Sequence, residues 1–253
     1  MKISIVIPCL NSHEILRRQL TYWRKINLPN NVEIIVVDDG STPSLLGVDL
    51  EFEEVLPNFQ ILFTHDYRPW TWALARNKGA KLATGDYLWM MDLDYIITQD
   101  CVDRTLAFTG DKLRFKREFG ILDERGVISQ DLGVLRQYGL LESRIQEKGL
   151  RMPPHPNNFC IRRELYWEMG GYPEDRIDRP YPQGEDRWFK RQWIKFVKEG
   201  KAKESDHDDR PTLLMFPNGQ FCGDVDHNPM NLFHNLSRKN DFNPAHLKLE
   251  ERA

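Results

Sequence analysis

Residues 75–94 read ARNKGAKLATGDYLWMMDLD, and this stretch decides the fold. The spacing of its apolar residues predicts a helix over residues 70–83, and the apolar run that follows predicts a strand over residues 86–91. Asp92 ends the strand and Asp94 follows it. Residues two apart on an extended segment point to the same side, so both carboxylates can face one divalent cation. Taken alone, the pair is more typical of a solvated loop.

Short β-branched runs and helical stretches alternate on the amino-terminal side of this segment. We expect strands over residues 3–7, 32–37 and 59–64, and a helix over residues 12–25 between the first two. This alternation is typical of βαβ units. It predicts an α/β domain with a Rossmann-like, mostly parallel central sheet flanked by helices.

The remainder of the chain is patterned less clearly. We expect helices over residues 101–116, 162–169 and 185–199, with a polar, glycine-containing segment after the first of them and a solvated loop over residues 200–210. We therefore interpret the chain as a single domain, residues 1–253. Its parts would be residues 1–100 and residues 101–253.

Composition and charge exclude several classes of protein. The 253 residues include 35 basic and 38 acidic ones, so nothing indicates the cationic surface that nonspecific nucleic-acid binding requires. The four cysteines form no CxxC pair, which argues against a zinc site and favours a reduced, cytoplasmic compartment. No apolar run suits a signal peptide or a transmembrane segment. Peripheral association with a membrane surface is compatible with the sequence. The sequence does not indicate an oligomeric state.

Polar residues also follow the first two predicted strands. Pro8 and Asn11 come at the end of the first strand, and Asp39 and Gly40 come at the end of the second. Ligands of open α/β sheets bind beyond the carboxyl ends of the strands, where a carboxylate can accept from a base N–H or a ribose hydroxyl. Taken alone, the sequence Asp-Asp-Gly-Ser is more often a simple turn.

Four segments together resemble a known family. SIVIPCLN (4–11), IIVVDDGS (34–41), ARNKGAKLATGDYLWMMDLD (75–94) and GED (184–186) resemble the successive motifs of family 2 glycosyltransferases and their GT-A relatives. The likeness covers residues 1 to about 100 and returns around 155–240. It implies a GT-A fold with a nucleotide-binding part over residues 1–100 and an acceptor-binding, catalytic-base part over residues 101–253. The implied activity is inverting, metal-dependent transfer of a sugar from a nucleotide diphosphate donor, with a UDP-sugar favoured, to a glycan or other hydroxyl acceptor.

The resemblance assigns roles to the residues of these motifs. The expected nucleotide contacts are Pro8, Asn11, Asp39, Arg76 and Asp92. Of these, Asp39 matches the aspartate that reads uracil. Asp94 is expected to bind Mn²⁺ or Mg²⁺ directly, with Asp92 touching the ribose or the metal through water. Asp186 matches the general base that takes the proton of the acceptor hydroxyl, and Glu185 is expected to hold sugar hydroxyls. Acidic residues in a first helical turn also serve as plain dipole partners.

A segment near the carboxyl terminus offers a third metal ligand. His234 and the residues after it resemble the third metal-ligand segment of β-1,4-galactosyltransferase-like enzymes, and we prefer His234 to His227 for this role. A lone histidine is more often structural or solvated. Arg238 and Lys239 are expected to pair with the diphosphate.

Four further residues are candidates for sugar or acceptor contacts. Gly170 and Gly171 can let the backbone approach the sugar, and they can equally form a helix end followed by a turn. Tyr181 and Trp188 flank the GED motif and are candidates to stack on a sugar. Aromatic residues at such positions more often pack in the core.

Two other functions remain as alternatives. A related sugar nucleotidyltransferase usually carries a glycine-rich, basic loop after the first strand, whereas residues 8–13, PCLNSH, contain neither glycine nor lysine. A catalytically degenerate protein could bind a nucleotide sugar or a glycan without turnover. The intact acidic motifs and His234 argue against that alternative.

Overall fold

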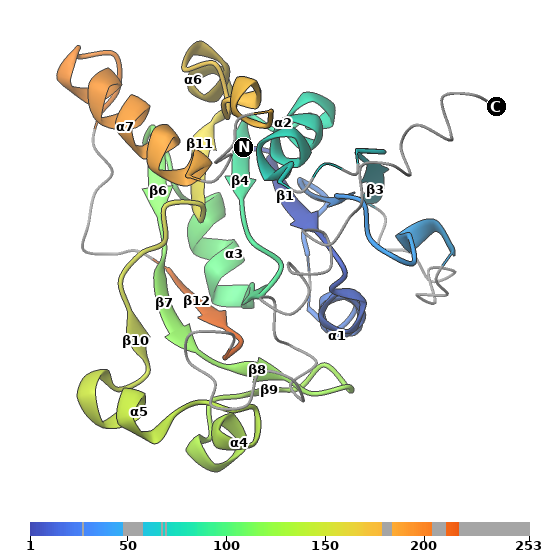
Figure 1. Cartoon of the computed structure of the whole chain (residues 1–253). Helices are drawn as coiled ribbons and strands as arrows, with labels where there is room; N and C mark the ends of the chain where they lie inside the picture. The colour runs from blue at the N-terminus through green and yellow to red at the C-terminus, as the bar shows by residue number, and fades with distance from the viewer. Residues whose placement is uncertain are drawn as a thin grey trace.

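A computed structural model gives the fold of the chain (Figure 1). It describes residues 1–26, 28–47, 58–66, 68, 70–178, 184–203 and 211–217. The centre is a six-stranded sheet in the order β3-β2-β1-β4-β11-β6. In that order its strands are Phe59–Phe63, Val32–Asp38, Ile3–Cys9, Tyr87–Met90, Phe159–Arg162 and Lys112–Arg114.

Parallel pairing brings the ends of the first strands to one edge. β1 pairs in parallel with β2 on one side and with β4 on the other, and Cys9 lies opposite Asp38. β11 runs antiparallel between β4 and β6. The predicted mostly parallel sheet is therefore confirmed, and the residues that follow β1, β2 and β4 emerge at the same edge.

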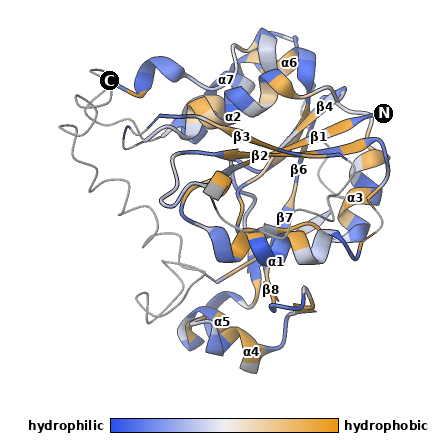
Figure 2. Ribbon diagram, turned by 90° about the vertical axis from the view of Figure 1, so that its right-hand side faces the viewer, coloured by the Kyte–Doolittle hydropathy of each residue, from blue (hydrophilic) through white to orange (hydrophobic). Residues whose placement is uncertain are grey.

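Helices cover both faces of this sheet (Figures 1 and 2). One face carries α1 (His13–Trp23) and α3 (Gln99–Leu106), and the other carries α2 (Trp72–Leu82), α6 (Arg163–Glu168) and α7 (Glu185–Lys198). Along β1, Ile5 and Ile7 belong to the core on the α1 face, whereas Val6 belongs to the core on the α2 face. Successive side chains of a strand point to opposite faces, which explains why these strands are continuous apolar runs.

A second sheet packs beside the first, in the order β10-β7-β12-β5. Its strands are Arg151–Met152, Lys116–Phe119, Thr212–Met215 and Tyr95–Ile96. The remaining elements are β8 (Ile121–Leu122), β9 (Ile128–Ser129), α4 (Leu132–Gln137), α5 (Glu142–Lys148) and the short 3₁₀ helices Leu45–Gly47 and Glu174–Arg176. Because β5 begins directly after Asp94, this sheet fixes the chain as it leaves the second aspartate of the DxD pair.

The predicted helix over residues 101–116 is wrong in its second half. α3 ends at Leu106, and Lys112–Arg114 forms strand β6. Thr109 and Gly110 are poor helix formers. Leu113 then pairs with Cys160 of β11, so tertiary pairing determines the conformation there. The helices expected over residues 12–25, 70–83, 162–169 and 185–199 are found as α1, α2, α6 and α7, with ends shifted by a few residues.

The thiols of the described cysteines and the lengths of the described helices bear on the expected compartment and on membrane spanning. Cys9, Cys101 and Cys160 are buried with free thiols, and Cys222 lies outside the described residues. Among the helices that the structure describes, none is both long and apolar enough to cross a bilayer.

Gly79 sets the distance between α2 and the sheet. A Cβ atom at this position would lie 2.4 Å from Cγ1 of Val6 and 3.1 Å from Cγ2 of Val37. We expect Gly79→Ala to lower the free energy of unfolding by about 1–3 kcal/mol, because the added methyl overpacks the contact, although alanine favours the helix. Urea unfolding measures this, with exposed Lys81→Ala on the same helix as the control. Unchanged stability in Gly79→Ala would contradict the close contact.

Lys112 is a buried cation beneath α7. Its ammonium group lies 4.3 Å from the ring centre of Phe159 and 5.0 Å from that of Trp193. Burial, together with the charges of Arg114 and Lys190, lowers the pKa of Lys112 from 10.5 to about 7. Lys112 therefore loses its proton more readily in the folded chain than in the unfolded chain.

Stability should rise with pH because of Lys112. Between about pH 7 and pH 10.5 the unfolded chain binds more protons at this residue than the folded chain, so the free energy of unfolding increases with pH. We expect Lys112→Met to raise it by about 2–4 kcal/mol at pH 6, since each pKa unit is worth about 1.4 kcal/mol, and by less at pH 9. Urea unfolding at both pH values measures the difference, with exposed Lys148→Met as the control. An equal gain at the two pH values would contradict the burial of a charged amine.

Candidate functional site

The site lies at the edge where the parallel strands end. Asn11 comes two residues after β1, Asp39 directly after β2, and Asp92 two residues after β4. The N–H of Asp39 donates to the carbonyl of Cys9 at 2.8 Å, which joins the first two strand ends. Three predicted nucleotide contacts thus come from neighbouring strands of one sheet.

The two consecutive aspartates of the second motif have different surroundings. The Asp38 carboxylate accepts from the N–H groups of Ser41 and Leu45, both at 2.9 Å, and so holds the loop after β2. Asp39 is fully buried and accepts from the Thr71 hydroxyl at 2.7 Å, at the start of α2. Asp38 therefore has a structural role, and Asp39 lies at the junction of β2 and α2. Contact of Asp39 with a base stays a prediction.

Asn11 and Pro8 shape the loop after β1. Asn11 has a positive φ of 48°, its N–H donates to the Ser41 hydroxyl at 2.9 Å, and its side-chain carbonyl accepts from the N–H of Thr42 at 2.7 Å. Pro8 lies within β1, opposite Val37. These contacts fix the two loops against each other, and a nucleotide contact of either residue stays a prediction.

Arg76 of α2 connects two distant motifs. Its side chain is 3% exposed, forms an ion pair and hydrogen bond with the Asp92 carboxylate, and lies 3.7 Å from the Glu185 carboxylate. Its guanidinium also lies over the rings of Trp72 and Tyr172, 5.9 Å and 5.3 Å from their centres. Burial disfavours its charge, but the carboxylates outweigh burial and the pKa of Arg76 is raised. The guanidinium therefore stays charged.

Asp92 is held from a third direction by the segment before β11. Its N–H donates to the side-chain carbonyl of Asn158 at 3.0 Å, and its carboxylate lies 3.6 Å from Nδ1 of His155. The same Nδ1 accepts from the N–H of Asn157 at 3.3 Å. Burial lowers the pKa of His155, although the negative charges of Asp92 and Asp186 act in the opposite direction.

Asp94 is the other candidate metal ligand. It is 5% exposed, and its carbonyl accepts from the N–H of Phe216 at 3.0 Å. The carboxylates of Asp92 and Asp94 are hard oxygen donors of the kind that suits Mg²⁺ or Mn²⁺. Within the described ranges, no group of three or more His, Cys, Asp or Glu side chains could hold a metal ion. His234 and His227 lie outside those ranges.

Glu185 and Asp186 begin helix α7. Gly184 precedes them with a left-handed φ of 94°. The Glu185 carboxylate is buried and accepts from the indole N–H of Trp70 at 3.2 Å. Asp186 is partly exposed and lines a pocket of ≈ 390 Å³. The pocket is lined by Trp70, Asn157, Gly184, Glu185, Asp186 and Arg187.

The two predicted glycines end helix α6. The N–H of Gly170 donates to the carbonyl of Trp167 and that of Gly171 to the carbonyl of Tyr166, at 2.9 Å and 3.0 Å, with both φ angles positive. This pattern is the Schellman motif. A Cβ on Gly171 would also lie 2.7 Å from the side-chain oxygen of Asn77. The geometry thus supports the helix-end interpretation, and a sugar contact stays a prediction.

Among the remaining predicted residues, the structure describes one. Trp188 is partly buried against the core on the α2 face and does not line the pocket, where Trp70 is the aromatic residue. Tyr181, Arg238 and Lys239 lie outside the described residues.

Sequence reasoning missed His155, which the structure brings next to Asp92. In the sequence it stands between prolines, in a stretch that reads as a boundary. The guanidinium of Arg117 donates a hydrogen bond to the carbonyl of Pro153 at 2.6 Å and another to the hydroxyl of Tyr95. These contacts connect the stretch to β5. The signal available in the sequence was a polar residue whose neighbouring prolines restrict the backbone.

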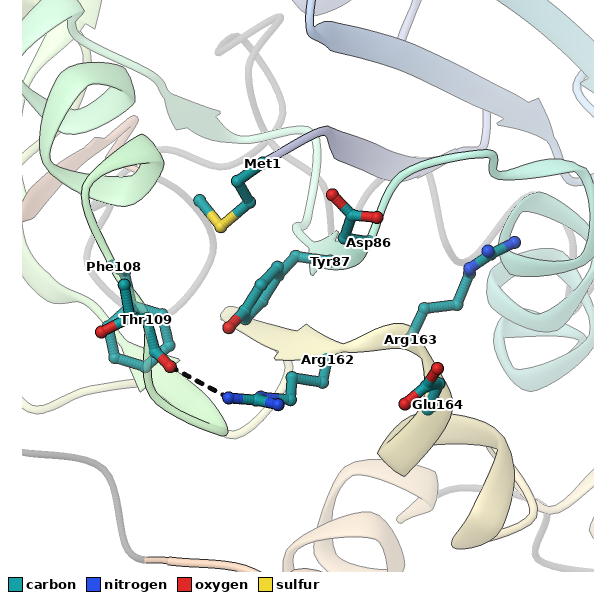
Figure 3. A pocket seen from close by; sticks show the side chains of 8 residues that line it. All are labelled: Met1, Asp86, Tyr87, Phe108, Thr109, Arg162, Arg163 and Glu164. Carbon is teal, nitrogen blue, oxygen red and sulfur yellow. Dashed lines mark hydrogen bonds between the residues drawn. The ribbon is translucent and has the colours of Figure 1, made fainter.

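A second pocket of ≈ 390 Å³ lies at the opposite end of the strands (Figure 3). Asp86 and Tyr87 at the start of β4 and Arg162 at the end of β11 line it. Arg162 pairs with Asp111 at 3.2 Å and donates to the carbonyl of Thr109 at 3.1 Å. None of the predicted site residues lines this pocket, so the candidate site stays the one around Arg76.

Comparisons with known proteins find relatives of the amino-terminal part of the chain. Residues 4–115 match the family model of glycosyl transferase family 2. Validoxylamine A glucosyltransferase of Streptomyces hygroscopicus subsp. limoneus is 35% identical over 108 residues, which are 42% of this chain and 23% of that protein. The matched region thus spans about a quarter of that relative.

Solved structures show the same fold. TarS of S. aureus has a TM-score of 0.57 at 20% identity, covering 97% of this chain and 68% of that chain. The mannosyltransferase PcManGT from Pyrobaculum calidifontis, in complex with GDP-Man and Mn²⁺, has a TM-score of 0.54 at 18% identity, covering 85% of this chain and 57% of that one. Residues 4–115 therefore match the model of glycosyl transferase family 2, and the chain shares the GT-A fold of these solved glycosyltransferases.

Proposed function

We propose that the chain transfers a sugar from a nucleotide diphosphate donor to a hydroxyl group of a glycan or other acceptor, with inversion at the anomeric carbon. The observation that carries this proposal is the position of Arg76. One buried guanidinium contacts Asp92, at the end of a strand, and Glu185, next to Asp186. The two acidic motifs therefore face one site although they are far apart in the sequence.

Asp186 is the proposed general base. It lines the pocket and is partly exposed, so an acceptor hydroxyl can reach it. The hydroxyl oxygen attacks the anomeric carbon while Asp186 takes its proton, and the bond from that carbon to the diphosphate oxygen breaks. Glu185, which contacts Trp70 and Arg76, is proposed to hold a sugar hydroxyl.

The nucleotide is proposed to bind at the strand ends, beside Asn11, Asp39 and Arg76. A UDP-sugar is favoured because Asp39 matches the aspartate that reads uracil in similar enzymes. Structures of TarS contain UDP or UDP-GlcNAc, whereas PcManGT contains GDP-Man, so proteins of this fold use either base. The preference for uracil therefore rests on Asp39.

Asp94 and Asp92 are the residues proposed to hold a divalent cation, with His234 as a third ligand. Asp92 already pairs with Arg76, so we give the direct contact to Asp94. When bound, Mn²⁺ or Mg²⁺ would neutralise charge on the leaving diphosphate. Arg76 adds a fixed positive charge next to the Asp92 carboxylate.

A thermal-shift panel tests the proposal. UDP, GDP, CMP and dTDP are each added with Mn²⁺, Mg²⁺ or EDTA. One nucleotide at about 100 times its Kd should stabilise the fold by about 2.7 kcal/mol, a rise in Tm of about 5–10 °C. We expect Asp94→Ala to lose the metal-dependent part of the rise, and exposed Asp103→Ala to keep it.

Three outcomes decide between the functions. A metal-dependent shift with one nucleotide and release of that nucleotide from its sugar donor supports the transferase. A shift without any turnover indicates a degenerate binding protein. Absence of a shift with every nucleotide contradicts nucleotide binding.

A further inference from the structure

Helix α7 carries a basic face that the proposed chemistry does not use. Between residues 187 and 198 the helix has five basic residues and no acidic one: Arg187, Lys190, Arg191, Lys195 and Lys198. At 3.6 residues per turn these positions fall within an arc of about 140°. The opposite face packs into the core through Phe189, Trp193 and Phe196.

Most of these charges have no carboxylate partner among the residues that the structure describes. Lys195 lies 3.7 Å from Glu199. The other four, Arg187, Lys190, Arg191 and Lys198, make no ion pair with any residue that the structure describes. Like charges on one helix face repel and destabilise the helix, so a row of five basic residues with one carboxylate, that of Glu199, near its end favours an anionic partner. The chain as a whole has a net charge of −3, which makes this face a local exception.

The basic face begins at the pocket. Arg187 lines it together with Asp186, the proposed base. From Arg187 the face continues for about 16 Å to Lys198, at about 1.5 Å per residue. Figure 1 shows α7 at the margin of the molecule beside β6.

From this placement we propose that the exposed face of α7 binds the acceptor, and that the acceptor is a polymer with phosphate groups recurring along its length. The inference rests on the proposed function, because it assigns the acceptor of the same site. Cations on successive turns, about 5.4 Å apart, match recurring anions better than a single phosphate, which would engage one turn.

A membrane surface fits this face less well. Helices that lie on membranes insert large apolar side chains between the headgroups. On α7 the aromatic residues point into the core, and Ile194, 44% exposed, is the large apolar residue on the basic face. Charge complementarity without an apolar face therefore favours a soluble polyanion.

The test measures binding of fluorescein-labelled inorganic polyphosphate by anisotropy at 50 mM and 200 mM salt. The variant carries Lys190→Gln, Arg191→Gln and Lys198→Gln, none of which lines the pocket. The control carries Lys81→Gln, Arg104→Gln and Lys148→Gln on three other helices. We expect the Kd to rise about tenfold or more in the variant only, with a shallower dependence on salt, because fewer counterions are released.

Three results would overturn the proposal. The first is an equal loss, or no loss, in the variant and the control. The second is binding to vesicles with 30% phosphatidylglycerol that the variant loses while its polyphosphate binding stays intact. The third is that the parent protein binds polyphosphate only after the carboxylates of residues 204–209 are neutralised, since the negative charge of this segment, which follows α7 in the sequence, would then prevent binding.

Nucleotide binding separates this inference from the proposed function. The α7 variant should keep the thermal shift with the nucleotide that stabilises the parent protein. If the parent shows no shift with any nucleotide, the proposed function fails. The comparison of polyphosphate binding still decides whether α7 binds a polyanion.

Discussion

Asp186→Asn should greatly slow nucleotide release from the sugar donor while leaving donor binding intact. An amide cannot take the proton of the attacking hydroxyl, and general-base catalysis typically contributes about 100- to 10,000-fold to the rate. We expect the rate to fall by that factor, measured as nucleotide diphosphate released from the donor that the thermal shifts identify. Asparagine has nearly the same shape, so the start of α7 and the pocket should persist.

The matched control is Asp100→Asn. Asp100 is the second residue of α3, as Asp186 is of α7, and each lies in the first turn of its helix. The control therefore removes a carboxylate that interacts favourably with a helix dipole but has no part in the proposed chemistry. If Asp186→Asn keeps more than about a tenth of the parent rate, the base must be another group.

The strands and helices of the first hundred residues follow from local pattern. β1 and β2 are short apolar runs bounded by turn residues, and α2 has the spacing of a helix that packs on a sheet. The strand β6 could not be predicted this way. Lys112 and Leu113 continue what reads as a helix, and they form a strand because they pair with β11, which comes much later in the chain.

The acidic residues of the candidate site could be proposed from the sequence because each stands in a recognisable motif, but their neighbours could not. Arg76 was expected beside the nucleotide, and its contacts with Asp92 and Glu185 depend on how α7 packs next to α2. His155 reaches Asp92 because Arg117 holds the loop before β11. Such contacts join segments far apart in sequence, where local pattern carries no signal.

Arg76→Met should lower the free energy of unfolding by about 3–5 kcal/mol. Removing one partner from a buried ion pair leaves the other charge uncompensated, and here two carboxylates lose the same guanidinium. Domains are stable by about 5–15 kcal/mol, so the loss is a large part of the total. Methionine keeps much of the side-chain volume between Trp72 and Tyr172, which limits the cavity. Urea unfolding measures the change.

Neutralising the carboxylates distinguishes charge from packing. Because the cost arises from unpaired negative charge, adding Asp92→Asn and Glu185→Gln to Arg76→Met should recover part of the lost stability. The control is Arg104→Met, which removes the exposed pair with Asp100 and should change stability by about 0.5 kcal/mol or less. If Arg76→Met costs no more than this control, the guanidinium does not hold the two acidic motifs together. The central observation behind the proposed function would then be lost.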